Sequence, residues 1–127
     1  MNKMINKKNI GAFCEMYGIT MDNYILEYLL ENQYIDFAIG DMAKELKISK
    51  PKAYEIIKKF EKKGYVKKSR IIGKTQLYIL NKENIKVKLF MRNFKECLNL
   101  VIEEYAEQKR PDIGGHAHVG IVSARNI

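Results

Sequence analysis

Residues 40–80 read GDMAKELKISKPKAYEIIKKFEKKGYVKKSRIIGKTQLYIL, and their first half predicts two helices in close succession. The first is expected over residues 39–46, where apolar side chains recur at helical spacing. Ser49 is a suitable N-cap for the second helix, and Pro51 fits its first turn, where a missing N–H group costs nothing. This second helix is expected to run over residues 50–63. Its buried face is expected to consist of Ala53, Ile56, Ile57 and Phe60.

A β-hairpin is predicted directly after the two helices. Gly64 is expected to end the second helix, because glycine is common just beyond a helix C-terminus. Residues 65–71 and 75–80 are rich in β-branched and aromatic side chains, and Gly73 lies in the turn between them. Residues 34–37 are expected to add a short strand. Helix, tight turn, helix and hairpin in this order predict a winged helix-turn-helix, a mainly α fold with a small β-hairpin.

A long helix is predicted after the hairpin. Apolar residues repeat at helical steps over residues 85–109, and a helix of that length measures about 36 Å. This is more than a small domain needs to cover its core, so the excess apolar stripe predicts a dimerisation helix that packs on a second copy. The expected interface residues are Phe90, Phe94, Cys97, Leu98, Val101 and Tyr105. The aromatic members of the stripe are also compatible with an effector pocket, although such spacing is more typical of a dimer seam.

These patterns divide the chain into four segments. Residues 1–20 are expected to be a partly helical N-terminal segment, residues 21–84 the winged helix-turn-helix domain, and residues 85–110 the C-terminal dimerisation helix. Residues 111–127 contain no lysine and both histidines. We expect them to form a flexible tail. Their composition, so unlike the Lys-, Asn- and Ile-rich body, raises the suspicion that they are vector-derived.

Positive charge is concentrated on the helix pair and the hairpin. The formal net charge of the whole chain is +8. Residues 41–92 contain 16 Lys and Arg against 5 Asp and Glu, a net charge of +11, whereas the other segments are neutral or slightly acidic. A localised basic surface attracts polyanions such as nucleic acid and raises encounter rates. The alternative is that the lysines only keep the protein soluble.

Several classes of protein lack support in the sequence. No apolar run approaches the roughly 18–20 residues that span a bilayer, so a soluble, cytoplasmic protein is expected. Cys14 and Cys97 stand in helix-like apolar contexts and are expected to be reduced core thiols. His116 and His118 lack the further ligands of a metal site. Since no catalytic constellation and no glycine-rich phosphate loop is apparent, we expect no enzymatic activity, no metal and no cofactor.

Residues 17–97 resemble small archaeal winged-helix transcription regulators of the broad MarR/ArsR-like group. The residues that carry the resemblance are Ile25–Asn32, Asp36-Phe37, Met42–Glu45, Ile48-Ser49, Gly64–Arg70, Ile72-Gly73 and Leu77–Asn81. The resemblance implies that the helix over residues 50–63 reads DNA and that the hairpin, the wing, grips the DNA backbone. Two residues depart from the group. Ala38 stands where a serine cap is typical, and Lys47 stands where the turn often has glycine, so a strained left-handed conformation is expected there.

Taken together, the observations favour a non-enzymatic, homodimeric transcription regulator that binds double-stranded DNA sequence-specifically. The N-terminal half of a recognition helix enters the major groove, and a wing arginine can enter a narrow minor groove. The candidate DNA-binding residues are Ser49, Lys50, Lys52, Tyr54, Lys58, Lys68, Arg70 and Lys74. The alternative is a winged-helix protein-interaction module in a transcription or replication assembly, which would more often expose apolar residues where this helix has lysines. The operator, any effector and the direction of regulation stay open.

Overall fold

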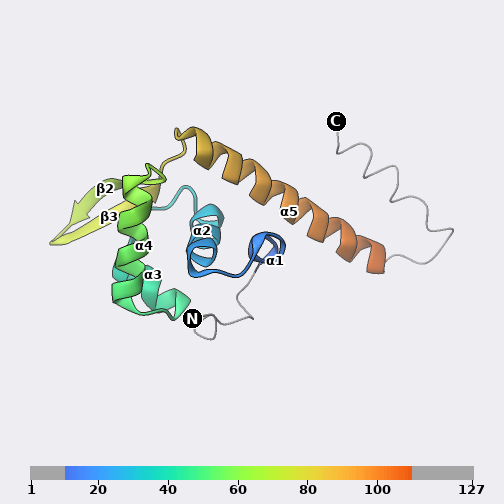
Figure 1. Cartoon of the computed structure of the whole chain (residues 1–127), viewed down its shortest axis with the longest axis horizontal. Coiled ribbons are helices and arrows are strands. Elements are labelled where there is room, and N and C mark those ends of the chain that lie inside the picture. Colours follow the sequence, from blue (N-terminus) through green and yellow to red (C-terminus); the bar gives the residue numbers. More distant parts are fainter. Residues whose placement is uncertain (1–10, 110–127) are drawn as a thin grey trace.

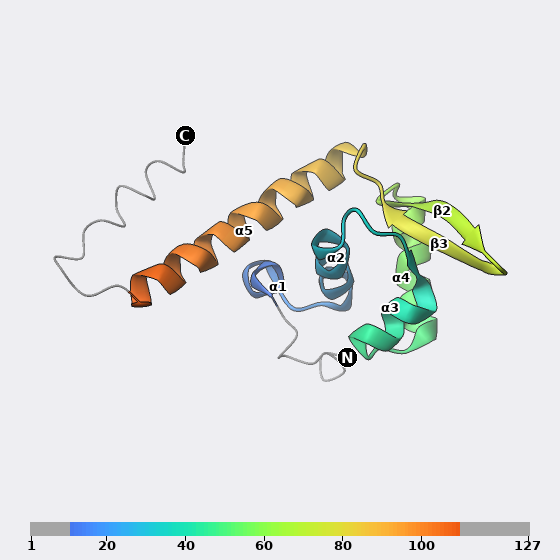
Figure 2. The ribbon, with the colours of Figure 1, turned by 180° about the vertical axis from the view of Figure 1, so that it is seen from behind.

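A computed structural model of the chain describes residues 11–109. The elements along these residues are α1 (Ala12–Tyr17), α2 (Met21–Glu31), β1 (Phe37–Ala38), α3 (Ile39–Leu46), α4 (Lys50–Lys62), β2 (Val66–Ile72), β3 (Thr75–Leu80) and α5 (Ile85–Lys109). Figures 1 and 2 show the hairpin of β2 and β3 projecting at one end of the molecule, while α5 runs past α2 and α1 toward the other. The predicted mainly α fold with a winged helix-turn-helix and a long C-terminal helix is confirmed.

The turn between α3 and α4 forms the predicted helix-turn-helix. Ala38 precedes α3 and provides no side-chain cap. Lys47 adopts the expected left-handed conformation with φ 60°, and the Ile48 N–H donates to the Ala43 carbonyl at 3.0 Å. This hydrogen bond satisfies a carbonyl at the end of α3, and Ile48 is buried in the core. Ser49 follows directly as the N-cap of α4, as predicted.

Two glycines in the left-handed region shape the wing. Gly64 has φ 81°, and just after it the Tyr65 N–H donates to the Phe60 carbonyl at 2.8 Å, which ends α4. Gly73 has φ 63° and begins the two-residue turn between β2 and β3. In that turn only Gly73 has a positive φ, and this pattern of φ signs is that of a type II′ turn. The hairpin therefore begins directly beside the end of α4.

The described strands form one antiparallel sheet in the order β1-β3-β2. The expected additional strand is present, but it consists of Phe37–Ala38 instead of residues 34–37. The physical reason is that Ile35 still belongs to the turn after α2, where its N–H donates to the Asn32 carbonyl at 3.1 Å. The first residue of β1 pairs with Tyr78 of β3, so the chain reaches the sheet later than predicted.

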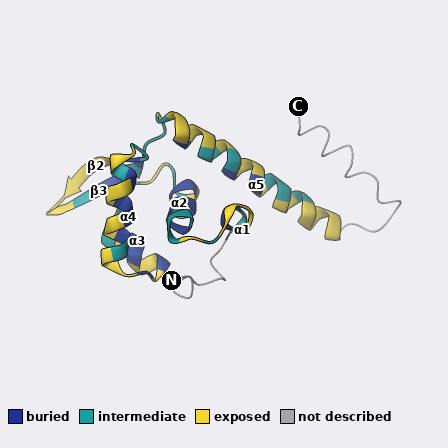
Figure 3. Cartoon of the chain, viewed as in Figure 1, coloured by how far each residue is buried: buried dark blue, intermediate teal, exposed yellow. Residues whose placement is uncertain are grey.

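The hydrophobic core contains the apolar faces that helical spacing predicted. Met42, Ala43 and Leu46 of α3 are buried together with the predicted face of α4. The first half of α5 covers α1, and the ring centroids of Phe94 and Phe13 lie 6.5 Å apart. Figure 3 shows that the far end of α5 is exposed, in contrast to the helices around the core. The helix is therefore longer than this core requires.

One carboxylate is buried within the core. Glu27 Oε1 accepts a hydrogen bond from the Gly11 N–H at 3.0 Å, and Glu27 Oε2 accepts one from the Cys14 N–H at 3.3 Å. A buried charge is tolerated only with such partners, and the N–H groups at a helix start need acceptors. Glu27 of α2 therefore caps α1 and fixes it to the core.

The remaining sequence predictions concern the cysteines and the ends of the chain. Cys14 and Cys97 are both free and buried, as expected of core thiols. None of the helices in the described part of the chain is long and apolar enough to cross a membrane. Residues 1–10 of the N-terminal segment and residues 110–127, which include the expected tail and its two histidines, lie outside the described residues.

Candidate nucleic-acid interface

The N-terminal end of α4 presents two lysines beside its capping serine. Ser49 Oγ accepts a hydrogen bond from the Lys52 N–H at 3.3 Å, so this hydroxyl serves the helix start. The Lys52 ammonium lies 3.6 Å from the carboxylate of Glu55. Lys50 is exposed, and its side chain passes close to Gly40 of α3. A Cβ atom placed on Gly40 would lie 3.6 Å from the Cε atom of Lys50. Among residues 11–109, no carboxylate forms an ion pair with Lys50.

A cleft between α4 and the wing brings three of the predicted residues together. The cleft has a volume of about 490 Å³ and is lined by Tyr54 and Lys58 of α4 and by Lys74 of the wing turn. Its other lining residues come from β3 and from the residues around the start of α3. Lys58 Nζ donates to the Tyr78 hydroxyl at 2.8 Å, and this hydrogen bond raises the pKa of Lys58. Ammonium and phenol groups in one cleft are suited to contacts with phosphate oxygens.

Arg70 of β2 is held by an acidic side chain that the sequence analysis did not assign to the site. The Arg70 Nε atom lies 2.9 Å from Asp36 Oδ2, and its Nη2 atom lies 3.4 Å from Asp36 Oδ1. Ser69 Oγ donates to Asp36 Oδ2 at 2.7 Å. Hydrogen bonds from Arg70 and Ser69 lower the pKa of Asp36. Lys68 and Lys74 are exposed, and no carboxylate in the described part of the chain pairs with either.

Asp36 and Tyr78 are the residues of this region that sequence reasoning missed. Their partners, Arg70 and Lys58, lie 34 and 20 positions away in the sequence, so no local pattern reveals these contacts. Only the register between β1 and β3 could have indicated these contacts. Pairing of Phe37 with Tyr78 brings the residue before β1 close to the hairpin.

The six residues predicted as a dimer interface divide into two groups. Phe94 and Cys97 are buried within the single chain, and the ring of Phe90 packs edge-on against Tyr65 with centroids 5.3 Å apart. These three side chains therefore offer little surface to a second copy. The other three are exposed, and so is Ile102, an apolar neighbour that was not assigned to the interface. The exposed fractions are 42% for Leu98, 43% for Val101, 61% for Tyr105 and 63% for the unassigned Ile102.

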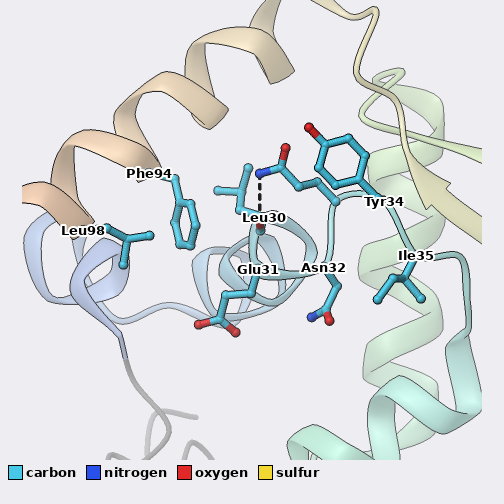
Figure 4. A pocket seen from close by; sticks show the side chains of 8 residues that line it. Leu30, Glu31, Asn32, Tyr34, Ile35, Phe94 and Leu98 are labelled. Carbon is cyan, nitrogen blue, oxygen red and sulfur yellow. Dashed lines mark hydrogen bonds between the residues drawn. The ribbon is translucent and has the colours of Figure 1, made fainter.

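An open pocket lies where α5 passes the end of α2 (Figure 4). It has a volume of about 570 Å³, and Phe94 and Leu98 of α5 face Glu31 and the loop that follows α2. Burial raises the pKa of Glu31, and the nearby carboxylates of Glu27 and Glu45 raise it further. The pocket therefore combines apolar walls with one carboxyl group that holds its proton more readily than usual.

The described residues offer no site for a metal. No group of three or more His, Cys, Asp or Glu within residues 11–109 is arranged to hold an ion. Burial, followed by the charge of Glu27, raises the pKa of Cys14 to about 12, and burial also raises the pKa of Cys97. A raised pKa disfavours the thiolate, which is the reactive and metal-binding form of cysteine.

Solved structures with the same fold include transcription regulators. The chain is similar to MepR, a transcription regulator of the Staphylococcus aureus multidrug efflux pump MepA, with a TM-score of 0.57 and 14% identity, covering 94% of this chain and 87% of that chain. A single-residue variant of S. aureus MepR bound to an oligodeoxyribonucleotide gives a TM-score of 0.55 and 14% identity, covering 94% and 86%. A mutant of Lactococcus lactis ZitR in apo form gives a TM-score of 0.53 and 21% identity, covering 83% of this chain and 78% of that chain.

These likenesses establish the fold. The chain has the same winged-helix fold as these regulators. No family model and no curated protein matches the chain by sequence.

Proposed function

We propose that the protein is a transcription regulator that binds double-stranded DNA sequence-specifically as a homodimer. The observation that carries the proposal is the cleft between α4 and the wing, where Tyr54, Lys58 and Lys74 line one concave surface. Seven of the ten residues that line this cleft belong to the segment with a net charge of +11, residues 41–92. MepR, which shares the fold, has been captured on an oligodeoxyribonucleotide, and this supports DNA as the partner.

The proposed contacts follow from the positions of the elements. The start of α4, with Lys50 and Lys52, would enter the major groove, where lysines contact guanine edges or phosphates. Lys68, Arg70 and Lys74 of the wing would contact the adjacent backbone or minor groove. The role of Lys68 and Lys74 would be to position the protein on DNA, whereas the start of α4 would read bases and Arg70 would respond to the sequence-dependent width of the minor groove.

The proposed dimer uses the part of α5 that its own subunit leaves exposed. Leu98, Val101 and Ile102 lie on this part of the helix, after Cys97, which is buried. Burying a large apolar side chain contributes roughly 1.5–3 kcal/mol, so several such residues on each chain are enough to hold two copies together. A two-fold axis would then present two α4 helices to half-sites about 34–36 Å apart, and the operator would be an inverted repeat.

The experiment that tests the proposal is selection of binding sites from random duplex DNA at defined salt concentrations. We expect an inverted repeat to be enriched. The logarithm of its association constant should fall with the logarithm of salt concentration, with a slope of about −0.9 for each neutralised phosphate. A protein that binds no duplex at low salt, or binds with no salt dependence, would contradict the proposal.

The alternative function, a protein-interaction module, has one observation in its favour. Ile71 and Ile72 are exposed beside the wing turn, where a DNA-binding wing more often carries basic residues. The exposed face of α4 argues the other way, because Lys50, Lys58 and Lys62 occupy it. The same selection experiment decides between the two, since an interaction module would enrich no sequence.

A further inference from the structure

Asp36 links the two edges of the sheet through the wing arginine. It directly precedes β1, and Arg70 belongs to β2, so the strand order β1-β3-β2 puts the two residues on opposite sides of β3. The Nε and Nη2 atoms of Arg70 bind both oxygens of the Asp36 carboxylate. Such a two-pronged contact restricts the orientation of a guanidinium more than a single hydrogen bond does.

An irregularity in β2 explains how two adjacent residues share this carboxylate. The pairing with β3 shifts between Lys68 and Ile71, so that two residues of β2 oppose one residue of β3. A β-bulge of this kind interrupts the regular alternation of side chains between the two faces of a strand and re-aims them. Ser69 and Arg70 consequently both donate to Asp36 Oδ2.

The two partners differ in their exposure to solvent. The side chain of Asp36 is 14% exposed, whereas that of Arg70 is 65% exposed. An arginine carries more N–H donors than the contact with Asp36 uses. The carboxylate is thus largely withdrawn from solvent, while the outer part of the guanidinium stays accessible.

We propose that Asp36 is a positioning residue for DNA recognition, which holds the Arg70 guanidinium so that its unused N–H groups meet the DNA in a fixed orientation. This inference rests on the proposed DNA binding. Because the orientation is set before binding, less side-chain entropy is lost when the complex forms. Asp36 therefore favours a matched site over random DNA.

The test measures the affinity of the full chain for its selected site and for a random duplex of equal length. Asp36→Asn removes the charge but keeps the size of the side chain, and we expect the ratio of the two affinities to fall by about tenfold, in the range of one charge-assisted hydrogen bond. The matched control is Glu83→Gln. It removes the same charge and breaks the 3.2 Å contact between Glu83 and Lys67 of β2, but leaves the Asp36 contact intact. The control should keep the ratio of the wild-type protein.

A double-mutant cycle separates positioning from a merely structural role. If Asp36 acts through Arg70, adding Asp36→Asn to Arg70→Gln should change the affinity ratio no further. Should Asp36→Asn fail to fold, Arg70→Lys decides the question, because lysine keeps the charge but cannot bind both carboxylate oxygens. It should lower the ratio by a similar factor.

The outcomes distinguish this inference from the function on which it rests. Wild-type protein that prefers no sequence would overturn the proposed function and this inference together. If the wild-type protein does prefer a sequence, the proposed function stands, and three results would overturn only the role of Asp36. These are that Asp36→Asn weakens binding to both duplexes equally, that its effect on the affinity ratio persists in the Arg70→Gln background, or that Arg70→Lys keeps the wild-type ratio.

Discussion

Lys58 and Tyr78 join α4 to β3, the central strand of the sheet. The Lys58 ammonium donates to the Tyr78 hydroxyl at 2.8 Å and lies 5.3 Å from the centroid of the same ring. The ring is buried, and its centroid lies 6.4 Å from that of Phe37 in β1. One residue of α4 therefore contacts β3 at the point where β3 pairs with β1. This contact is thus a direct link between α4 and the wing.

We expect Tyr78→Phe to lower the free energy of unfolding by about 0.5–1 kcal/mol, because it removes the hydroxyl but keeps the packed ring. The low magnitude follows from the solvent exposure of Lys58, which weakens the contact. Urea unfolding measures the change. Tyr65→Phe is the matched control, since the Lys63 ammonium lies 5.7 Å from the Tyr65 ring without donating to its hydroxyl. Equal losses in the two variants would mean that the hydrogen bond to Lys58 contributes nothing.

Replacing Lys47 by glycine should stabilise the protein. The left-handed conformation destabilises the folded state by roughly 1–2 kcal/mol for a residue with a Cβ atom, and glycine avoids this strain. Part of the benefit is lost because glycine has more conformational freedom in the unfolded chain. The expected net rise in the free energy of unfolding is about 0.5–1 kcal/mol. It should appear as a higher urea midpoint at an unchanged slope. Lys47→Ala loses the same charge but keeps the strain, so a comparable rise in this control would refute the conformational explanation.

Alkaline pH should destabilise the fold through Cys14. Burial raises the pKa of Cys14 from 9.0 to about 12, so the folded state holds the thiol proton more tightly than the unfolded state does. This contribution to stability is complete below pH 9 and is lost as the pH rises toward 12. In that window the free energy of unfolding should fall by up to about 1.4 kcal/mol per pH unit.

Comparison of urea unfolding at several pH values for the wild-type protein and Cys14→Ala measures the Cys14 contribution. The free energy of unfolding of the variant should fall less steeply with pH than that of the wild-type protein. Some fall should remain in both proteins, because the pKa of Tyr28 is also raised to about 12. Identical pH profiles would show that Cys14 does not titrate differently in the folded state.

The helices and their caps could be predicted because their signals are local. The spacing of Met42 and Leu46 and the cap at Ser49 lie within one or two helical turns, and α3 has its predicted bounds, Ile39–Leu46. The left-handed turn at Lys47 was predicted from the resemblance instead, because related regulators often have glycine at that position.

The contacts between elements could not be predicted in the same way. Helical periodicity identified the apolar stripe of α5, but it does not say what covers each part, and α1 covers Phe94. The contact between Asp36 and Arg70 depends on the register of a two-residue strand and on a bulge in β2. Strand length and bulge position depend on tertiary packing more than on local propensity.

The oligomeric state should depend on the exposed apolar residues of α5. We expect Val101→Glu to convert a dimer into a folded monomer, because a charge in the centre of the interface must be desolvated without a partner. Analytical ultracentrifugation gives the oligomeric state, and far-UV circular dichroism reports whether the variant folds. Ile85→Glu is the control, since Ile85 is 80% exposed on the same helix but lies outside the proposed interface. Wild-type protein that sediments as a monomer at high micromolar concentration would refute the dimer.

Lys74 should bind the DNA backbone without reading its sequence. It lies in the wing turn, lines the cleft beside Tyr54 and Lys58, and has no ion-pair partner among residues 11–109. Its ammonium is therefore available to a phosphate at no cost of breaking another contact. We expect Lys74→Ala to weaken binding to specific and random duplexes by the same factor, and to make the log–log salt dependence shallower by about 0.9.

Fluorescence anisotropy titrations of both duplexes over a range of salt concentrations measure this effect of Lys74. Lys95→Ala is the matched control, because Lys95 is an equally charged, exposed residue of α5 and lies outside the cleft. It should leave the salt dependence unchanged, since only a lysine that neutralises a phosphate releases a counterion on binding. If Lys74→Ala weakens only the specific complex, the wing turn contributes to sequence reading, and the assignment of Lys74 to the backbone is wrong. If both lysine variants make the salt dependence equally shallow, net charge alone accounts for the effect, and the cleft has no special role.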